Sequence, residues 1–186
     1  MTEELFLREV QKEDAALLAK WFNDKENVAF MTTHVRNSKH TASSIWKDIV
    51  DMKKLDSDYE KLFIVSIGED KKPIGHAGLD EIDLEDRRGE IFFMIGEKEY
   101  KGRGLGTKIA EAILDYAFNN MHLNSLSATV SEDNKPSIAV TEKIGFKRAG
   151  VRREYNFING RFVDEIFYDM TLKDYEDRNR LRSHGL

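Results

Sequence analysis

The feature that most constrains this chain is a glycine-rich turn, YKGRGLGT over residues 100–107, between an apolar run and an amphipathic segment. Residues 90–95 (EIFFMI) are almost continuously apolar, which suits a strand covered on both faces. Residues 107–121 carry apolar side chains three and four positions apart, which predicts a helix. Amide groups at such a strand-to-helix turn converge with the helix N-terminus, so the turn is expected to bind phosphate.

The composition of the turn supports an anion site. Gly102, Gly104 and Gly106 would let the backbone approach a pyrophosphate without interference from a Cβ atom, and basic side chains alternate with them. The residues expected to bind the phosphates are Lys101, Gly102, Arg103, Gly104, Leu105, Gly106 and Thr107, with Lys108 supplying further charge.

Two common phosphate-binding motifs do not match this turn. A dinucleotide fingerprint needs G-x-G-x-x-G/A, but counting from Gly102 places Thr107 in the third glycine position. A P-loop needs Gly-Lys-Ser/Thr, whereas the chain has Gly106-Thr107-Lys108. The spacing that remains is Lys101-x-x-Gly104-x-Gly106.

That spacing is one residue away from the Q/R-x-x-G-x-G/A pattern of the GNAT acetyltransferase superfamily, which the chain resembles. Residues 131–146 (SEDNKPSIAVTEKIGF) resemble the N-x-x-S-x-x-x-x-E-K-x-G-F segment of that family, one strand downstream of the turn. Residues 75–95, which include Arg87-Arg88-Gly89-Glu90, resemble the branches of ribosomal-protein N-terminal and bacterial spermidine acetyltransferases. Lys101 departs from the pattern, because it keeps a cation but not a bidentate fork.

The order of predicted elements is strand, two helices, a strand meander, helix, strand, helix and hairpin, which indicates a mixed α/β fold. Asn159-Gly160 is the strongest turn signal and centres the last hairpin. Residues 23–41 read as a loop, and the polar tail after Lys173 is expected to be mobile. The resemblance implies a largely antiparallel, twisted central sheet with splayed central strands and flanking helices, forming a single N-acetyltransferase domain over residues 1–186.

The resemblance also implies acetyl-CoA as the co-substrate. The acetyl group is expected to lie across the splayed strand that ends at Met94, Ile95 and Gly96, whose N–H groups would polarise its carbonyl. The chain contains no cysteine, which agrees with direct attack by the amine in a ternary complex rather than a thiolate intermediate.

The proton carriers of the reaction are less well defined by the sequence. Glu81 and Glu90 are the candidate bases, with Glu81 preferred if it faces the groove, although each could instead be a surface carboxylate or, for Glu90, a partner of Arg87 or Arg88. Asp80 is grouped with Asp83, Glu85 and Asp86 as a solvated turn.

The family's usual proton donor is absent from this chain. Many members carry a tyrosine acid seven residues after the asparagine, where this chain has Thr141, so Ser137 or a water is the substitute donor. Asn134 is expected to hold the coenzyme through its side-chain amide.

The acceptor is expected to be an amine, with a protein N-terminus favoured over a polyamine or other small amine. Its selection is assigned to aromatic and histidine side chains, many of which could simply be core: Trp21, Phe22, Phe30, His34, Trp46, Tyr155 and Phe157. The two alternatives to an enzyme are a non-catalytic module that binds coenzyme A and a nucleotide-binding domain of another family.

Other partners are not indicated. A net charge of −5 argues against nucleic acid, and the five histidines show no metal-ligand spacing. No apolar run is long enough to span a membrane, and the acidic start is unlike a signal peptide, so a cytoplasmic location is expected. A homodimer is compatible with these expectations.

Overall fold

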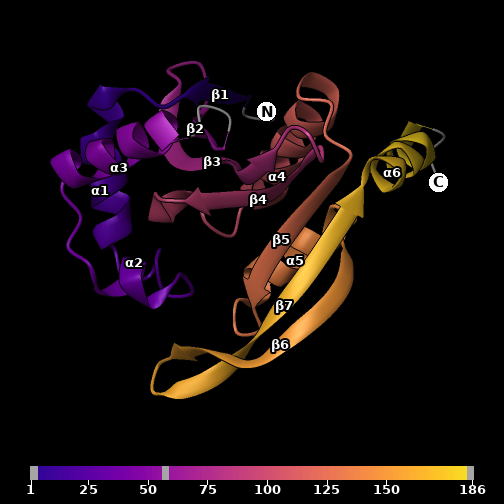
Figure 1. Ribbon diagram of the computed structural model, residues 1–186. Helices are drawn as coiled ribbons and strands as arrows, with labels where there is room; N and C mark the ends of the chain where they lie inside the picture. The colour runs from indigo at the N-terminus through magenta and orange to yellow at the C-terminus, as the bar shows by residue number, and fades with distance from the viewer. Residues whose placement is uncertain (1–3, 56–58, 184–186) are drawn as a thin grey trace.

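The computed structural model describes residues 4–55 and 59–183. One seven-stranded sheet crosses these residues in the order β1-β2-β3-β4-β5-β7-β6 (Figure 1). Neighbouring strands are antiparallel except β4 and β5, which are parallel. The strands are β1 (Leu5–Glu9), β2 (Lys61–Ile67), β3 (Lys72–Asp83), β4 (Arg88–Ile95), β5 (Ser125–Ser131), β6 (Lys147–Ile158) and β7 (Arg161–Thr171). The predicted mixed fold with a largely antiparallel sheet is confirmed.

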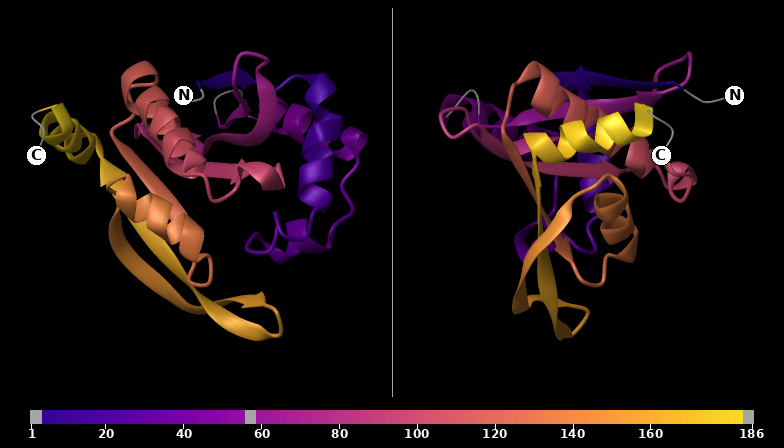
Figure 2. Two further views of the ribbon diagram at one scale, coloured as in Figure 1. Left: turned by 180° about the vertical axis from the view of Figure 1, so that it is seen from behind. Right: turned by 90° about the vertical axis from the view of Figure 1, so that its right-hand side faces the viewer.

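Helices cover both faces of this sheet. They are α1 (Ala15–Asn23), α2 (Thr33–Asn37), α3 (Ala42–Leu55), α4 (Leu105–Asp115), α5 (Lys135–Lys143) and α6 (Leu172–Ser183). On one face α4 and α5 lie side by side (Figure 2), and the fully buried Ile109 and Ile113 of α4 pack with Leu79 of β3. On the other face, Leu18 of α1 packs against Ile64 of β2.

The last hairpin shows how local residues set the architecture. Asn159 and Gly160 have φ values of 49° and 82°, the left-handed pair that a two-residue hairpin turn requires. The predicted hairpin is therefore confirmed, with Phe157 paired to Phe162 beside the turn. Both rings are exposed and touch edge to face, at 5.1 Å between centroids.

The sheet opens between β4 and β5, its two central strands. They pair only through Arg88–Glu90 and Ser125–Ser127, and beyond these residues β4 continues beside β3 while β5 continues beside β7. Figure 1 shows the two halves diverging from this point. The expected splay of the central strands is confirmed, and it leaves one edge of β4 without a neighbouring strand.

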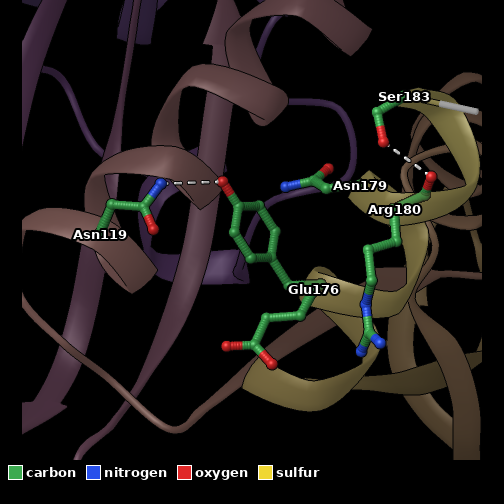
Figure 3. A pocket seen from close by; sticks show the side chains of 6 residues that line it. Asn119, Glu176, Asn179, Arg180 and Ser183 are labelled. Carbon is green, nitrogen blue, oxygen red and sulfur yellow. Dashed lines mark hydrogen bonds between the residues drawn. The ribbon is translucent and has the colours of Figure 1, made fainter.

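Two segments differ from the sequence-based expectation. The predicted loop over residues 23–41 contains the short helix α2. The tail expected to be mobile forms α6, because Tyr175 is buried and stacks on Phe118 at 4.8 Å. Asn119, in the π-helical turn that follows α4, donates a hydrogen bond to the Tyr175 hydroxyl (Figure 3). No helix within the described residues is long and apolar enough to cross a membrane.

Candidate active site

The glycine turn owes its shape to two positive backbone angles. Gly104 is the N-cap of α4 with φ 77°, and Gly102 has φ 73°. A Cβ atom on either would meet nothing within 4 Å, so here glycine is required by conformation and leaves open space beside the backbone. Gly106 differs, because it is buried and an added Cβ would lie 3.4 Å from Val140 and 3.5 Å from Phe93. Gly106 therefore packs closely in the core, and its expected contact with the coenzyme stays a prediction.

The first turn of α4 can receive an anion. Among the described side chains none caps this end of the helix, so its leading N–H groups face outward. Arg103 and Lys108 are exposed beside it, and Arg103 lies over the Tyr100 ring at 5.4 Å. Uncapped amides, an open glycine backbone and two exposed cations fit a pyrophosphate.

Lys101 occupies a different position from its neighbours. Its ammonium donates a hydrogen bond to Oδ1 of Asn27, a residue 74 positions away in the segment after α1. The expected phosphate ligand is thus engaged with the opposite wall of the site.

Asn134 and Ser137 begin helix α5. The Ser137 N–H donates to Oδ1 of Asn134 at 3.3 Å, which makes Asn134 the N-cap. The amide nitrogen of Asn134 has no partner in the described part of the chain, so it remains available to a ligand. Thr141, at the position of the family's tyrosine, is buried in the same helix.

The free edge of β4 exposes alternate amides. The Gly96 N–H donates to the carbonyl of Ile74 at 2.8 Å, so it faces β3. Met94, paired with His76, shares this orientation because antiparallel hydrogen-bonded pairs recur every two residues. The N–H groups of Phe93 and Ile95 then point toward the opening. Of the three expected oxyanion donors only Ile95 is suitably placed, and Met94 and Gly96 are corrected on this ground.

Gly96 has another reason to be glycine. An added Cβ would lie 2.3 Å from the indole of Trp21, which packs directly on this residue. Trp21 is 1% exposed, so it belongs to the core and is not an acceptor contact.

A side chain closes the ladder at the point where β4 and β5 separate. Oε1 of Glu90 accepts the Thr129 N–H at 3.1 Å and also accepts the Thr129 hydroxyl. In a continued parallel ladder this N–H would bond to the carbonyl of Ile91, so the carboxylate takes the place of the next backbone acceptor. Glu90 therefore pairs with Thr129 and not with Arg87 or Arg88, the partners that the sequence suggested.

Asp80 lies directly across from Glu90 on β3. Its Oδ1 is buried and has no hydrogen-bonding partner among the described residues. Burial raises the pKa of Asp80 to about 7, and the charges of Glu90, Glu60 and Glu81 add to this rise. The assignment of Asp80 to a solvated turn was wrong, because β3 extends to Asp83 and Oδ1 of Asp80 is buried.

Glu81, the preferred base in the sequence, is placed differently. It is exposed and has φ 48°, within the irregular register between Asp80 and Asp83. Asp80 shares the face of His76 and Gly78 by the regular alternation of β3, whereas Glu81 lies in the bulge and is exposed. No local pattern signals this bulge, although the alternating polar and small residues His76, Gly78 and Asp80 could have marked one unusual face of the strand.

An aromatic row continues from Asp80 along the same face. His76 is 4% exposed, with its ring 5.2 Å from Phe22 and 5.8 Å from Phe92. Both of its ring nitrogens are buried without partners in the described residues, and burial lowers the pKa of His76 to about 4. Among the aromatic candidates for acceptor selection, Phe30, Tyr155 and Phe157 are exposed.

A pocket lies between the π-helical turn and α6 (Figure 3). It is lined by Asn119, Tyr175, Glu176, Asn179, Arg180 and Ser183. None of the residues expected to bind coenzyme or acceptor contributes to it.

Comparisons with known proteins agree with these features. The sequence model of the family described as "Acetyltransferase (GNAT) domain" matches residues 4–147. An uncharacterized N-acetyltransferase p20 of Bacillus licheniformis is 28% identical over 174 residues, covering 94% of this chain and 96% of that protein. Spermidine N(1)-acetyltransferase of Escherichia coli K12 is 29% identical over 160 residues, covering 86% and 82%. The putative ribosomal N-acetyltransferase YdaF of Bacillus subtilis is 31% identical over 102 residues, covering 55% of each.

The fold has a solved counterpart. Spermidine N-acetyltransferase from Vibrio cholerae, crystallised with CoA and spermine, superposes with a TM-score of 0.81 and 23% identity, covering 92% of this chain and 98% of the other. At this identity the likeness establishes the fold.

Proposed function

The chain belongs to the GNAT family of acetyltransferases, and on that premise we propose that it transfers the acetyl group of acetyl-CoA to a small cationic primary amine by direct attack. The observation that carries this proposal is the free edge of β4. It has an uncapped helix N-terminus at one end and the Asp80–Glu90 carboxylate pair at the other. An acetyl group laid along this edge would meet the N–H groups of Phe93 and Ile95.

The proton chemistry is assigned to the two carboxylates. An aliphatic amine has a pKa of about 10.4, so it enters mainly as an ammonium and must lose a proton before it attacks. A carboxylate whose pKa is about 7, as for Asp80, suits a general base near neutral pH. Glu90 shares the site, and its charge helps to keep the pKa of Asp80 high. We propose that the pair accepts the proton, directly or through one water.

The leaving thiolate needs less assistance. A thiol with a pKa near 8.5 lies only about 1.5 units above neutral, which corresponds to roughly 2 kcal/mol. Ser137 lies in the first turn of α5, and we propose it, or a water next to it, as the donor that replaces the family's tyrosine. The amide nitrogen of Asn134 is proposed to hold the coenzyme.

The acceptor proposal differs from the order that the sequence favoured. Four carboxylates gather at this end of the sheet, because Glu60, Glu81 and Glu90 all act on the pKa of Asp80. Such a cluster favours an acceptor with more than one positive charge over a single α-amine. The long match to spermidine N(1)-acetyltransferase supports the same choice. The protein N-terminus remains the second candidate, supported by the shorter match to YdaF.

Thiol release from acetyl-CoA across an amine panel tests this function. The panel contains spermidine, spermine, a monoamine of equal length, N-terminal peptides, aminoglycosides and amino sugars. We expect kcat/KM to be highest for the polyamines and at least tenfold lower for the monoamine. Turnover confined to N-terminal peptides would reverse the acceptor order, and no turnover with intact coenzyme A binding would favour a non-catalytic coenzyme sensor.

A further inference from the structure

Asn27 joins three segments of the active site through one side chain. Its Nδ2 donates to the carbonyl of Gly96 at 3.0 Å and to the carbonyl of Trp21 at 3.2 Å, while its Oδ1 accepts the Lys101 ammonium. These partners belong to the end of β4, the end of α1 and the start of the glycine turn. Both N–H groups and the carbonyl oxygen of the Asn27 side chain thus bond to residues that frame the site.

The contact changes what Lys101 does. A lysine at this position of the motif would be expected to supply charge to a phosphate, yet its ammonium is held by a neutral carbonyl oxygen of the opposite wall. Lys101 is half-buried, whereas Arg103 and Lys108 are exposed at the mouth of the turn. The two exposed cations are thus better placed for phosphates than Lys101.

Neighbouring contacts run between the same segments. Glu97 accepts hydrogen bonds from Lys20 and from the Trp21 indole, the latter at 2.9 Å. Lys98 forms an exposed ion pair with Glu26 at 2.9 Å. Asn27 is the part of this junction that reaches both the open edge of β4 and the glycine turn.

We propose that Asn27 is a positioning residue that uses Lys101 to lock the coenzyme turn to the acceptor-side wall. The proposal rests on the proposed function only for its effect on turnover, because its effect on coenzyme A affinity is independent of the acceptor. With the lock in place, the turn and the Gly96 end of β4 hold one relative position before the coenzyme arrives. Loss of either partner releases both, so the two residues act as a unit.

A double-mutant cycle tests the lock. We measure the Kd of coenzyme A by calorimetry for the wild type, Asn27→Ala, Lys101→Met and the double variant. Each single change is expected to weaken binding about tenfold, and the double variant should be no weaker than the worse single variant. Asn27→Asp retains an oxygen for Lys101 but removes the Nδ2 donors to the Gly96 and Trp21 carbonyls, so its Kd is expected to rise as in Asn27→Ala. Lys98→Met is the matched control, because it removes a lysine contact between the same segments without touching Gly96, and its Kd should be unchanged.

Several results would overturn the proposal. If the losses of coenzyme A affinity in the two single variants were additive, or if Lys101→Met weakened binding and Asn27→Ala did not, Lys101 would instead be a direct phosphate ligand. A lowered melting temperature for Asn27→Ala with an unchanged Kd would reduce Asn27 to a stabilising role. A wild-type protein that binds coenzyme A but acetylates no amine would refute the proposed function. The double-mutant cycle would still test the proposed lock, because it measures only coenzyme A affinity.

Discussion

The proposed coenzyme side and the proposed acceptor side of this site are built from different kinds of chemical group. The coenzyme side relies on backbone: two left-handed glycines, an uncapped helix end and strand amides that face an opening. The proposed acceptor side relies on side chains that titrate: His76 is buried, Asp80 is half-buried, and the pKa of each is shifted. The contrast teaches that binding of the coenzyme should depend on conformation, whereas chemistry on the acceptor should depend on protonation.

The largest expected effect comes from removing the charge of Asp80, which should affect catalysis but not coenzyme binding. Asp80→Asn should lower kcat about 1,000-fold, because it removes the proposed base while keeping shape. The wild-type kcat/KM should rise with pH through about 7, as Asp80 loses its proton, and the variant should lack this limb. Coenzyme A affinity should not change.

Glu85→Gln, in the exposed turn after β3, is the matched control and should keep the wild-type profile. If Glu81→Gln abolished the limb while Asp80→Asn retained it, the base would be the exposed glutamate, and the contrast between the sides would fail.

The next largest effect is expected in the glycine turn of the coenzyme side. Gly104→Val should weaken coenzyme A binding at least 100-fold, because it strains a φ of 77° and projects a side chain into the open space of the turn. Gly68→Val is a matched control, since Gly68 has φ 76° and equally open surroundings in the turn after β2. Both variants should lose similar stability, about 1–2 kcal/mol by chemical denaturation. Equal coenzyme affinity in the two would refute the phosphate site.

A smaller effect is expected where the sides meet. Thr129→Val removes the hydroxyl that donates to Glu90 and keeps the N–H. We expect kcat to fall about tenfold with the Kd of coenzyme A within twofold, because the carboxylate loses one of its two restraints. Ser127→Ala on the same strand, where the hydroxyl only reaches the Gly89 carbonyl at 3.4 Å, should be nearly silent in the same assay.

The smallest effect concerns stability. His76 is neutral in the folded protein, so unfolding takes up a proton below pH 6.5 and stability is lost as pH falls toward 4. His76→Phe should remove about 2 kcal/mol of that loss between pH 6.5 and 5, measured by urea denaturation.

Asp80 acts in the opposite direction. Its pKa is raised, so the stability it contributes at low pH is lost as pH rises toward 7. Asp80→Asn should therefore steepen the acid loss of stability, and an unaltered slope in both variants would show that neither group titrates in the fold.

The sequence predicted the features that depend on neighbouring residues. The glycine turn, the Asn159-Gly160 hairpin and the α5 start at Asn134 all follow from residues that restrict their own backbone. The splay followed from the family resemblance. These features account for most of the coenzyme side.

The remaining features depend on contacts between distant segments. Gly96 is required by Trp21, and Lys101 is held by Asn27, both through packing that no local pattern encodes. Asp80 was missed because the acidic residues around it were interpreted as one solvated turn, whereas β3 continues to Asp83. The acceptor side was therefore predictable only as an approximate region.

The replacement of a backbone acceptor by the Glu90 carboxylate has a consequence for the evolution of such enzymes. Where main-chain groups alone join two strands, their spacing is fixed for every sequence. Here the last contact between the two strands is made by the side chain of Glu90, so a substitution at this one residue can change the distance between the two halves of the sheet. If the acyl group lies at this opening as proposed, a change at Glu90 is expected to alter the size of acyl group admitted without changing either hydrophobic core.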